Sequence, residues 1–163
     1  MKELWERGLS DGKSLSAIVP NLHIPDYGTA MTSSIYLRGF GSRMDNPVLG
    51  LYIDDIPVLD KNAYDFDWLD IRSAELYRGP QGTLYGRNAM CGVLSLTTLS
   101  PAVWQGFRAS AEYGSFGTVN LQASLYKGNY GAGVAYRHRS GYYRNAYDDS
   151  PVDRLDAVQL RFR

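Results

Sequence analysis

The 163-residue sequence has no long apolar run, a single cysteine, two histidines and no net charge. No stretch approaches the ~20 consecutive apolar residues that a membrane-spanning helix needs, which excludes a helical span. One cysteine cannot form an intramolecular disulfide, and we interpret Cys91 as a small buried hydrophobic residue. Seventeen basic residues balance seventeen acidic ones, which argues against a nucleic-acid partner.

The residues that build catalytic and metal sites are also scarce. His23 and His138 have no cysteine or carboxylate at ligand spacing, so we predict no metal site and no cofactor. The aspartate-rich stretch 60–70 lacks the central glycine and final glutamate of a calcium-binding loop, and we interpret it as a solvated turn or helix. No nucleophile motif or acid and base carboxylate pair occurs. We therefore predict no catalytic residues and no enzyme activity.

Glycine and tyrosine are abundant, with 17 and 13 residues, and both favour β-strands joined by tight turns. Four of the glycines interrupt segment 75–96, which predicts a strand, a turn and a second strand. Gly79 followed by Pro80 marks the turn. Arg78 and Arg87 flank it, and a guanidinium in an otherwise apolar segment needs a polar partner. We therefore expect this turn to be docked against another part of the protein.

Three motifs together resemble the plug domain of TonB-dependent outer-membrane receptors, and they occur in that family's order. They are Leu37-Arg38-Gly39-Phe40-Gly41, the run LYIDDIPV at 51–58, and Arg78-Gly79-Pro80-Gln81 followed by Leu84-Tyr85-Gly86 and Gly92-Val93. The structural motif positions are Gly39, Gly79, Pro80, Gly86 and Gly92. The sequence departs from the family pattern at Asp55 and Cys91, where glycine is common, and in the run LSLTT at 94–98.

Beyond residue 101, four segments alternate apolar and polar residues with a period of two, the pattern of half-exposed strands. The alternating runs start at Phe107, Val119, Ala132 and Val158. Amphipathic strands of about ten residues are typical of a transmembrane β-barrel, although a soluble antiparallel sheet shows the same alternation. The preceding plug-like segment favours the barrel. Four strands cannot close it, because a plugged transporter needs about 22.

The predicted fold class is an α+β plug domain, a small mixed sheet with short helices, followed by antiparallel strands of an incomplete transmembrane β-barrel. The predicted domains are 1–101, the plug, and 102–163, the first barrel strands. The N-terminus has no apolar signal-peptide core, and the family carries a leader and a TonB-binding box ahead of the plug. We therefore expect a fragment that is truncated at both ends.

The resemblance implies energy-coupled uptake of a scarce nutrient, such as a siderophore, a cobalamin or a glycan, across the bacterial outer membrane. The implied partners are the TonB complex, through an N-terminal box missing from this chain, a small-molecule or glycan ligand, and outer-membrane lipid. Two alternatives stay open, a soluble β-rich ligand-binding module and an interaction or signalling protein that reuses a plug-like domain.

The resemblance also implies an orientation for the strands. The first barrel strand would rise from the periplasm, so 114–117 would be an outer turn and 127–129 a periplasmic turn. The long, polar and tyrosine-rich segment 140–153 would be an extracellular loop.

Two sets of site residues are predicted. The resemblance implies that Arg38 and Arg78, each at a strand end and followed by glycine, face carboxylates on the inner barrel wall and lock the plug. Glu75 and Glu112 are the alternative, local partners. Polar, irregular segments between plug strands are candidate ligand-binding apices, with plain solvated loops as the alternative. The ligand-binding candidates are Tyr27, Arg43, Asn46 and Tyr64.

Overall fold

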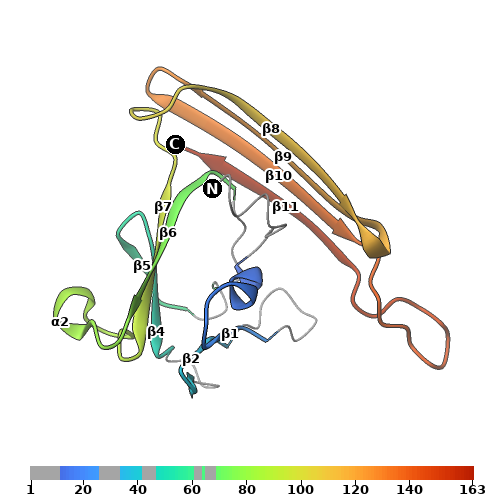
Figure 1. Ribbon diagram of the computed structural model, residues 1–163. Coiled ribbons are helices and arrows are strands. Elements are labelled where there is room, and N and C mark those ends of the chain that lie inside the picture. Colours follow the sequence, from blue (N-terminus) through green and yellow to red (C-terminus); the bar gives the residue numbers. More distant parts are fainter. Residues whose placement is uncertain (1–11, 26–33, 42–46, 61–63, 65–68) are drawn as a thin grey trace. The chain divides into compact units, whose positions relative to one another are not determined.

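The computed structural model describes residues 12–25, 34–41, 47–60, 64 and 69–163 (Figure 1). The chain divides into two compact units, Met1–Thr98 and Leu99–Arg163. The predicted domain boundary lies slightly further along the chain, after residue 101. In the described part of the chain, no helix has the length and apolar character required to span a membrane.

The main sheet of the first unit is mixed, with the strand order β5-β4-β7-β6 (Figure 1). The central strands β4 and β7 run parallel, and β5 and β6 pair antiparallel on either side of them. Central strands of a sheet covered on both faces are apolar throughout, and the sequences LGLYI of β4 and GVLSLTT of β7 largely follow this rule. The four strands are β4 (Leu49–Ile53), β5 (Ile56–Val58), β6 (Ile71–Arg78) and β7 (Gly92–Thr98).

One face of this sheet carries the main hydrophobic core. Leu51, Leu94 and Leu96 are between 0% and 2% exposed. They pack with side chains from the short elements η1 (Lys13–Ala17) and β1 (Leu22–His23). The opposite face has a smaller cluster of Tyr52, Ala89 and Val93, with Tyr85 packed against it.

A second, very small sheet has the order β1-β2-β3, with β2 at Tyr36–Leu37 and β3 at Phe40–Gly41. Here the structure corrects the prediction that Arg38 ends a strand. Leu37 pairs with Phe40, so Arg38 and Gly39 form a two-residue turn with φ of +54° and +80°. Such positive φ values at both positions are typical of a type I′ hairpin turn.

Helices contribute less than the α+β prediction implies. The helices whose full extent the structure describes have only three to five residues, and they are η1, α2 (Gly82–Tyr85) and η3 (Ser115–Gly117). A short helix is unfavourable because its first turn is costly to form. α2 begins at Gly82 and stops before Gly86, whose φ of +68° cannot continue a right-handed helix. The regular structure in the described part of the first unit is therefore mostly β.

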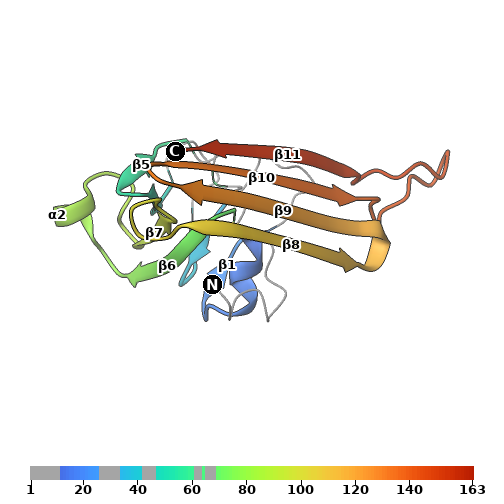
Figure 2. The same ribbon diagram turned by 90° about the horizontal axis from the view of Figure 1, so that it is seen from above.

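The second unit is a four-stranded antiparallel sheet with the order β11-β10-β9-β8, and Figure 2 shows its strands side by side. Its strands lie where the sequence alternation predicts them. η3 joins β8 to β9, a turn at Gly128 with φ +62° joins β9 to β10, and 140–154 joins β10 to β11. The four strands are β8 (Gly106–Gly114), β9 (Thr118–Lys127), β10 (Tyr130–Arg139) and β11 (Leu155–Phe162).

Candidate functional site

One face of the β8–β11 sheet is apolar and exposed. The strand pairing aligns its side chains into three rows that cross all four strands. Phe107 is 69% exposed, Leu160 63% and Phe162 77%. A water-soluble antiparallel sheet would bury such a face, whereas a membrane barrel turns it toward lipid. The rows are Phe107, Leu125, Ala132, Phe162; Ala109, Ala123, Val134, Leu160; and Ala111, Leu121, Tyr136, Val158.

Polar residues bound this apolar belt at both ends. At one end His138 pairs with Asp156 across β10 and β11, with 2.6 Å between His138 Nδ1 and Asp156 Oδ1. Arg154 Nε donates to the other carboxylate oxygen at 2.8 Å. At the opposite end Lys127 pairs with Tyr130. A strand rising ~3.4 Å per residue at a tilt of ~40° covers about 21 Å between these ends, close to the ~25 Å apolar band of outer-membrane barrels.

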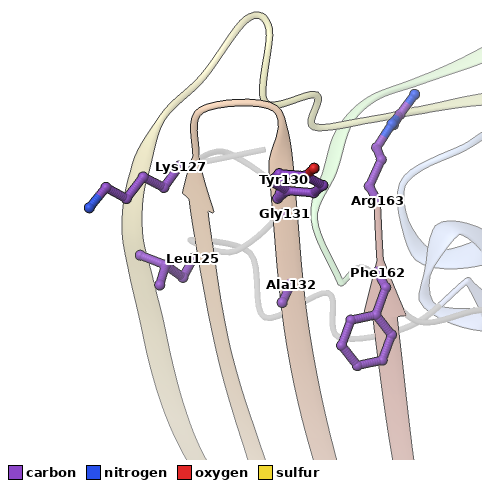
Figure 3. Close-up of a pocket in the computed structure, with 7 residues that line it drawn as sticks. All are labelled: Leu125, Lys127, Tyr130, Gly131, Ala132, Phe162 and Arg163. Atoms are coloured by element: carbon purple, nitrogen blue, oxygen red, sulfur yellow. The ribbon is translucent and has the colours of Figure 1, made fainter.

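A hollow lies on the sheet near the Lys127 and Tyr130 end of the belt (Figure 3). The apolar side chains of Leu125, Ala132 and Phe162 line it together with Lys127. The lining thus combines apolar side chains with two cationic ones, Lys127 and Arg163.

The opposite, inner face of the same sheet is polar and rich in arginine. One row reads Arg108, Ser124, Gly133 and Arg161 across the four strands. Another contains Glu112, whose carboxylate accepts a hydrogen bond from the Asn120 amide at 3.2 Å. Sequence analysis did not single out these arginines, although their period-two spacing on single strands was visible. The arginines of this face are Arg108, Arg137, Arg139, Arg161 and Arg163.

The β10–β11 connection has an ordered base built around the buried Asp153. Its Oδ1 accepts the Tyr143 N–H at 2.9 Å, and its Oδ2 lies 3.7 Å from Arg139 Nη2. Gly141 has φ +91°, and a Cβ there would lie 2.6 Å from Asp153 Oδ1. Further out, hydrogen bonds from Ser150 hold the pKa of the Asp148 carboxyl below its usual value. The connection is thus a folded hairpin extension, and the buried carboxylate at its base was not predicted.

The glycine-rich segment between β6 and β7 folds back on itself. The Gly79 N–H donates to the Cys91 carbonyl and the Gln81 N–H to the Ala89 carbonyl, both at 2.9 Å. Gly79 has φ +100°, and a Cβ on Gly92 would lie 2.4 Å from the Tyr77 carbonyl oxygen, so both positions require glycine. Partial burial raises the pKa of the Cys91 thiol, which disfavours a nucleophilic thiolate.

A contact that sequence analysis missed joins the β4–β5 turn to the end of β7. Asp54 and Asp55 form this two-residue turn with φ of +49° and +67°. The Asp54 carboxylate accepts two hydrogen bonds from Thr98, from its backbone N–H at 2.7 Å and from its hydroxyl at 2.6 Å. No local sequence signal pairs residues so far apart.

The predicted locking arginines are both exposed. Among the described residues, neither Arg38 nor Arg78 has a side-chain hydrogen bond or an ion pair. The local alternatives are engaged elsewhere, because Glu75 accepts the Tyr77 hydroxyl at 2.5 Å and Glu112 accepts the Asn120 amide. The locking role stays a prediction.

Of the four ligand-binding candidates, Tyr27, Arg43 and Asn46 lie outside the described residues. Tyr64 is corrected, because it is only 3% exposed and belongs to the main core. Its hydroxyl donates to the Leu49 carbonyl at 2.9 Å and accepts the Leu51 N–H at 3.2 Å. Burial raises the pKa of Tyr64 to about 12. The side chain anchors β4 and has no surface to offer a ligand.

Known proteins resemble this chain in sequence and in fold. The family model of the TonB-dependent Receptor Plug Domain matches residues 1–93. The pesticin receptor of Yersinia pestis is 40% identical over 101 residues, which are 61% of this chain and 15% of that protein. The ferrioxamine B receptor of Salmonella typhimurium is 27% identical over 126 residues, 74% of this chain and 17% of that protein.

Among solved structures, the ferric yersiniabactin uptake receptor FyuA from Yersinia pestis matches with a TM-score of 0.76 and 29% identity. The match covers 99% of this chain and 27% of the receptor, so it includes both units. This chain thus spans about a quarter or less of the length of these relatives. They are receptors and not enzymes, and they belong to the bacterial outer membrane. Since the family model covers more than half of the residues, this chain belongs to the family of TonB-dependent outer-membrane receptors.

Proposed function

We propose that this chain is the plug and the first barrel strands of a receptor that takes up a ferric siderophore across the outer membrane with energy from the TonB complex. The observation that carries the proposal is the outward apolar face of β8–β11, which suits lipid, in a chain that also holds a plug-type mixed sheet. Two relatives are named for iron chelates, ferric yersiniabactin and ferrioxamine B. These names favour a siderophore over a cobalamin or a glycan.

The plug is suited to movement without unfolding. Its main sheet is stabilised by a continuous apolar core on one face, with Leu51 and Leu96 fully buried. Its other face carries the small Tyr52 cluster together with polar residues such as Ser95 and Glu75, and these polar residues can exchange protein partners for water at small cost. A plug built in this way can shift inside a wet lumen while its core stays intact.

Arg38 and Arg78 are the proposed locking residues of this plug. A guanidinium in a lumen gains charge-assisted bidentate bonds only where a carboxylate lies opposite it. Replacing both by alanine in the full-length receptor should loosen the plug and increase passage of large antibiotics. If antibiotic permeability and siderophore uptake both stay at the wild-type level, the locking role is wrong, and these arginines are only solvated residues at a turn and a strand end.

The proposal is tested by expressing the full-length receptor in a strain without siderophore receptors of its own. We expect uptake of radioactive iron from a panel of ferric siderophores, and loss of that uptake when TonB is deleted. Surface labelling confirms that the receptor reaches the outer membrane in equal amount in both strains. A correctly inserted receptor that transports none of the chelates would refute the proposal.

A further inference from the structure

The outward face of β8–β11 carries a groove that begins at the turn between β9 and β10. Two hollows form it, and both are lined by Leu125, Ala132 and Phe162. The first hollow reaches Lys127 at the turn, and the second continues along the sheet to Ala123. The groove therefore leads from the polar edge of the apolar belt into the belt itself.

The groove exists because small side chains lie between large ones. Ala132 lies between Leu125 and Phe162 in one row of the sheet, as Figure 3 shows. In the next row Ala123 on β9 is small, and it pairs with Ala109 on β8. Successive rows lie ~7 Å apart along a strand. A floor of alanines bounded by bulky side chains fits a single hydrocarbon chain.

The position of the groove indicates an occupant from the membrane. A further strand that pairs with β11 would extend the sheet sideways through backbone hydrogen bonds, and the outward side chains would stay uncovered. This face is apolar, and the chain belongs to a family of outer-membrane receptors. The outward apolar band of such a barrel contacts lipid. The acyl chain of a lipid is therefore the occupant that fits the groove.

The charge at the mouth of the groove favours one class of lipid. Lys127 is exposed there and has no carboxylate partner in the described part of the chain. Of the described residues that line the two hollows, none is acidic. The opposite end of the belt differs, because Arg154 and His138 both contact the Asp156 carboxylate, at 2.8 and 2.6 Å. Only the Lys127 end thus offers a cation without a counter-charge beside it.

The head group, and not the acyl chain, decides which lipid is selected. Lipid tails are as apolar as the groove, so packing a chain into it gains shape complementarity without a hydrophobic driving force. A lysine near the membrane surface favours an anionic lipid over a neutral one roughly fivefold. Tyr130 pairs with Lys127 across the turn, and its hydroxyl can donate a hydrogen bond to a phosphate oxygen.

We propose that this groove is a binding site for an anionic phospholipid, with one acyl chain over Ala132 and Ala123 and the phosphate at Lys127. The orientation that the family resemblance implies places 127–129 on the periplasmic side, where the outer membrane has its phospholipid leaflet. This supports a phospholipid over lipopolysaccharide as the occupant. The inference rests on the lipid-facing orientation of the sheet in the proposed function and is independent of the transported chelate.

The test uses the full-length receptor in nanodiscs that contain equal amounts of phosphatidylglycerol and phosphatidylethanolamine. A trace of one or the other lipid carries a photoreactive diazirine in its acyl chain, and mass spectrometry maps the adducts on the receptor. The measured quantity is the ratio of phosphatidylglycerol to phosphatidylethanolamine adducts on the groove residues. Calorimetric unfolding temperatures confirm that each variant is folded.

Four variants separate head-group recognition from chain packing. Lys127→Gln removes the charge at the mouth, and Lys127→Arg retains it. The matched control is Arg144→Gln, which removes one charge from a side chain that is 65% exposed, lies outside the groove and pairs with Asp149. Ala132→Leu fills the floor of the groove and leaves the charge in place.

We expect the wild-type adducts in the groove to favour phosphatidylglycerol roughly fivefold, and Lys127→Gln to bring this ratio close to one. Lys127→Arg and Arg144→Gln should keep the wild-type ratio. Ala132→Leu should remove most groove adducts for both lipids, while adducts elsewhere on the outward face stay unchanged.

Four results would overturn the inference. They are a wild-type ratio near one, a wild-type ratio in Lys127→Gln, groove adducts that survive Ala132→Leu, and adducts spread evenly over all outward rows. Loss of the phosphatidylglycerol adducts when lipopolysaccharide is added to the nanodiscs would assign the groove to that lipid instead. A receptor that shows the expected adducts but transports no ferric siderophore would support the lipid site and refute only the proposed uptake.

Discussion

Asp54→Asn is the substitution for which the structure gives the sharpest expectation. The wild-type carboxylate accepts the Thr98 N–H at 2.7 Å and the Thr98 hydroxyl at 2.6 Å. Asparagine keeps the size of the side chain and tolerates the left-handed backbone that position 54 adopts, at φ +49°. The substitution therefore removes charge from the contact and leaves the turn intact.

The magnitude follows from the two bonds. Hydrogen bonds to a charged group contribute about 1 kcal/mol more than neutral ones, so two of them give about 2 kcal/mol. Thr98 is only 5% exposed, but Asp54 is half-buried, and solvent screening reduces the expected loss to about 1.4 kcal/mol. A loss of this size corresponds to a roughly tenfold change in an opening equilibrium.

Hydrogen–deuterium exchange of the full-length receptor measures this change at the end of β7. We expect the Thr98 amide to exchange roughly tenfold faster in Asp54→Asn. Asp55→Asn is the matched control, since Asp55 is the exposed neighbour in the same turn, at φ +67°. Equal exchange of the Thr98 amide in the two variants would refute the reasoning that the Asp54 carboxylate holds the strand end.

Three further predictions concern folding and topology. Tyr64→Phe leaves the buried Leu49 carbonyl and Leu51 N–H without their side-chain partner, which should destabilise the plug by about 2 kcal/mol. Calorimetry should show a lower unfolding temperature, and an unchanged temperature would contradict this. Gly92→Ala should reduce the level of folded receptor in the outer membrane because its Cβ would meet the Tyr77 carbonyl, whereas Gly82→Ala, with open space around it, should not. An epitope inserted after Asp149 should be labelled on intact cells, and labelling only after permeabilisation would reverse the orientation of the strands.

The second unit was predictable from sequence because its determinants are local. Alternation with a period of two places Phe107 and Ala109 on one face and Arg108 on the other, and the structure has them so. Turn residues such as Gly128 mark the strand ends. Both signals lie within a few residues of the feature that they predict.

The first unit was less predictable because distant residues decide it. Tyr64 lies in a polar, aspartate-rich stretch, and only its hydrogen bonds to β4 reveal that it is core. Arg38 continues an alternating run, yet the pairing of Leu37 with Phe40 makes it a turn residue. The Asp54 and Thr98 contact joins residues from the two ends of the main sheet's sequence. Periodicity carries no information on such long-range pairs.

The strict pairing across β8–β11 limits how the length of this chain can vary. One residue inserted inside β10 would shift the register by one and turn Arg137 and Arg139 toward lipid, with Val134 and Tyr136 facing water. An arginine on the lipid face costs ~2–4 kcal/mol at mid-bilayer depth and ~0–1 kcal/mol near the interface, the depth at which Arg137 and Arg139 would lie. Only insertions in pairs keep the faces in phase, while the 140–154 connection has no such constraint. Insertions and deletions among related receptors should therefore occur in the 140–154 connection and not in the strands. Changes in what that connection binds should occur with them.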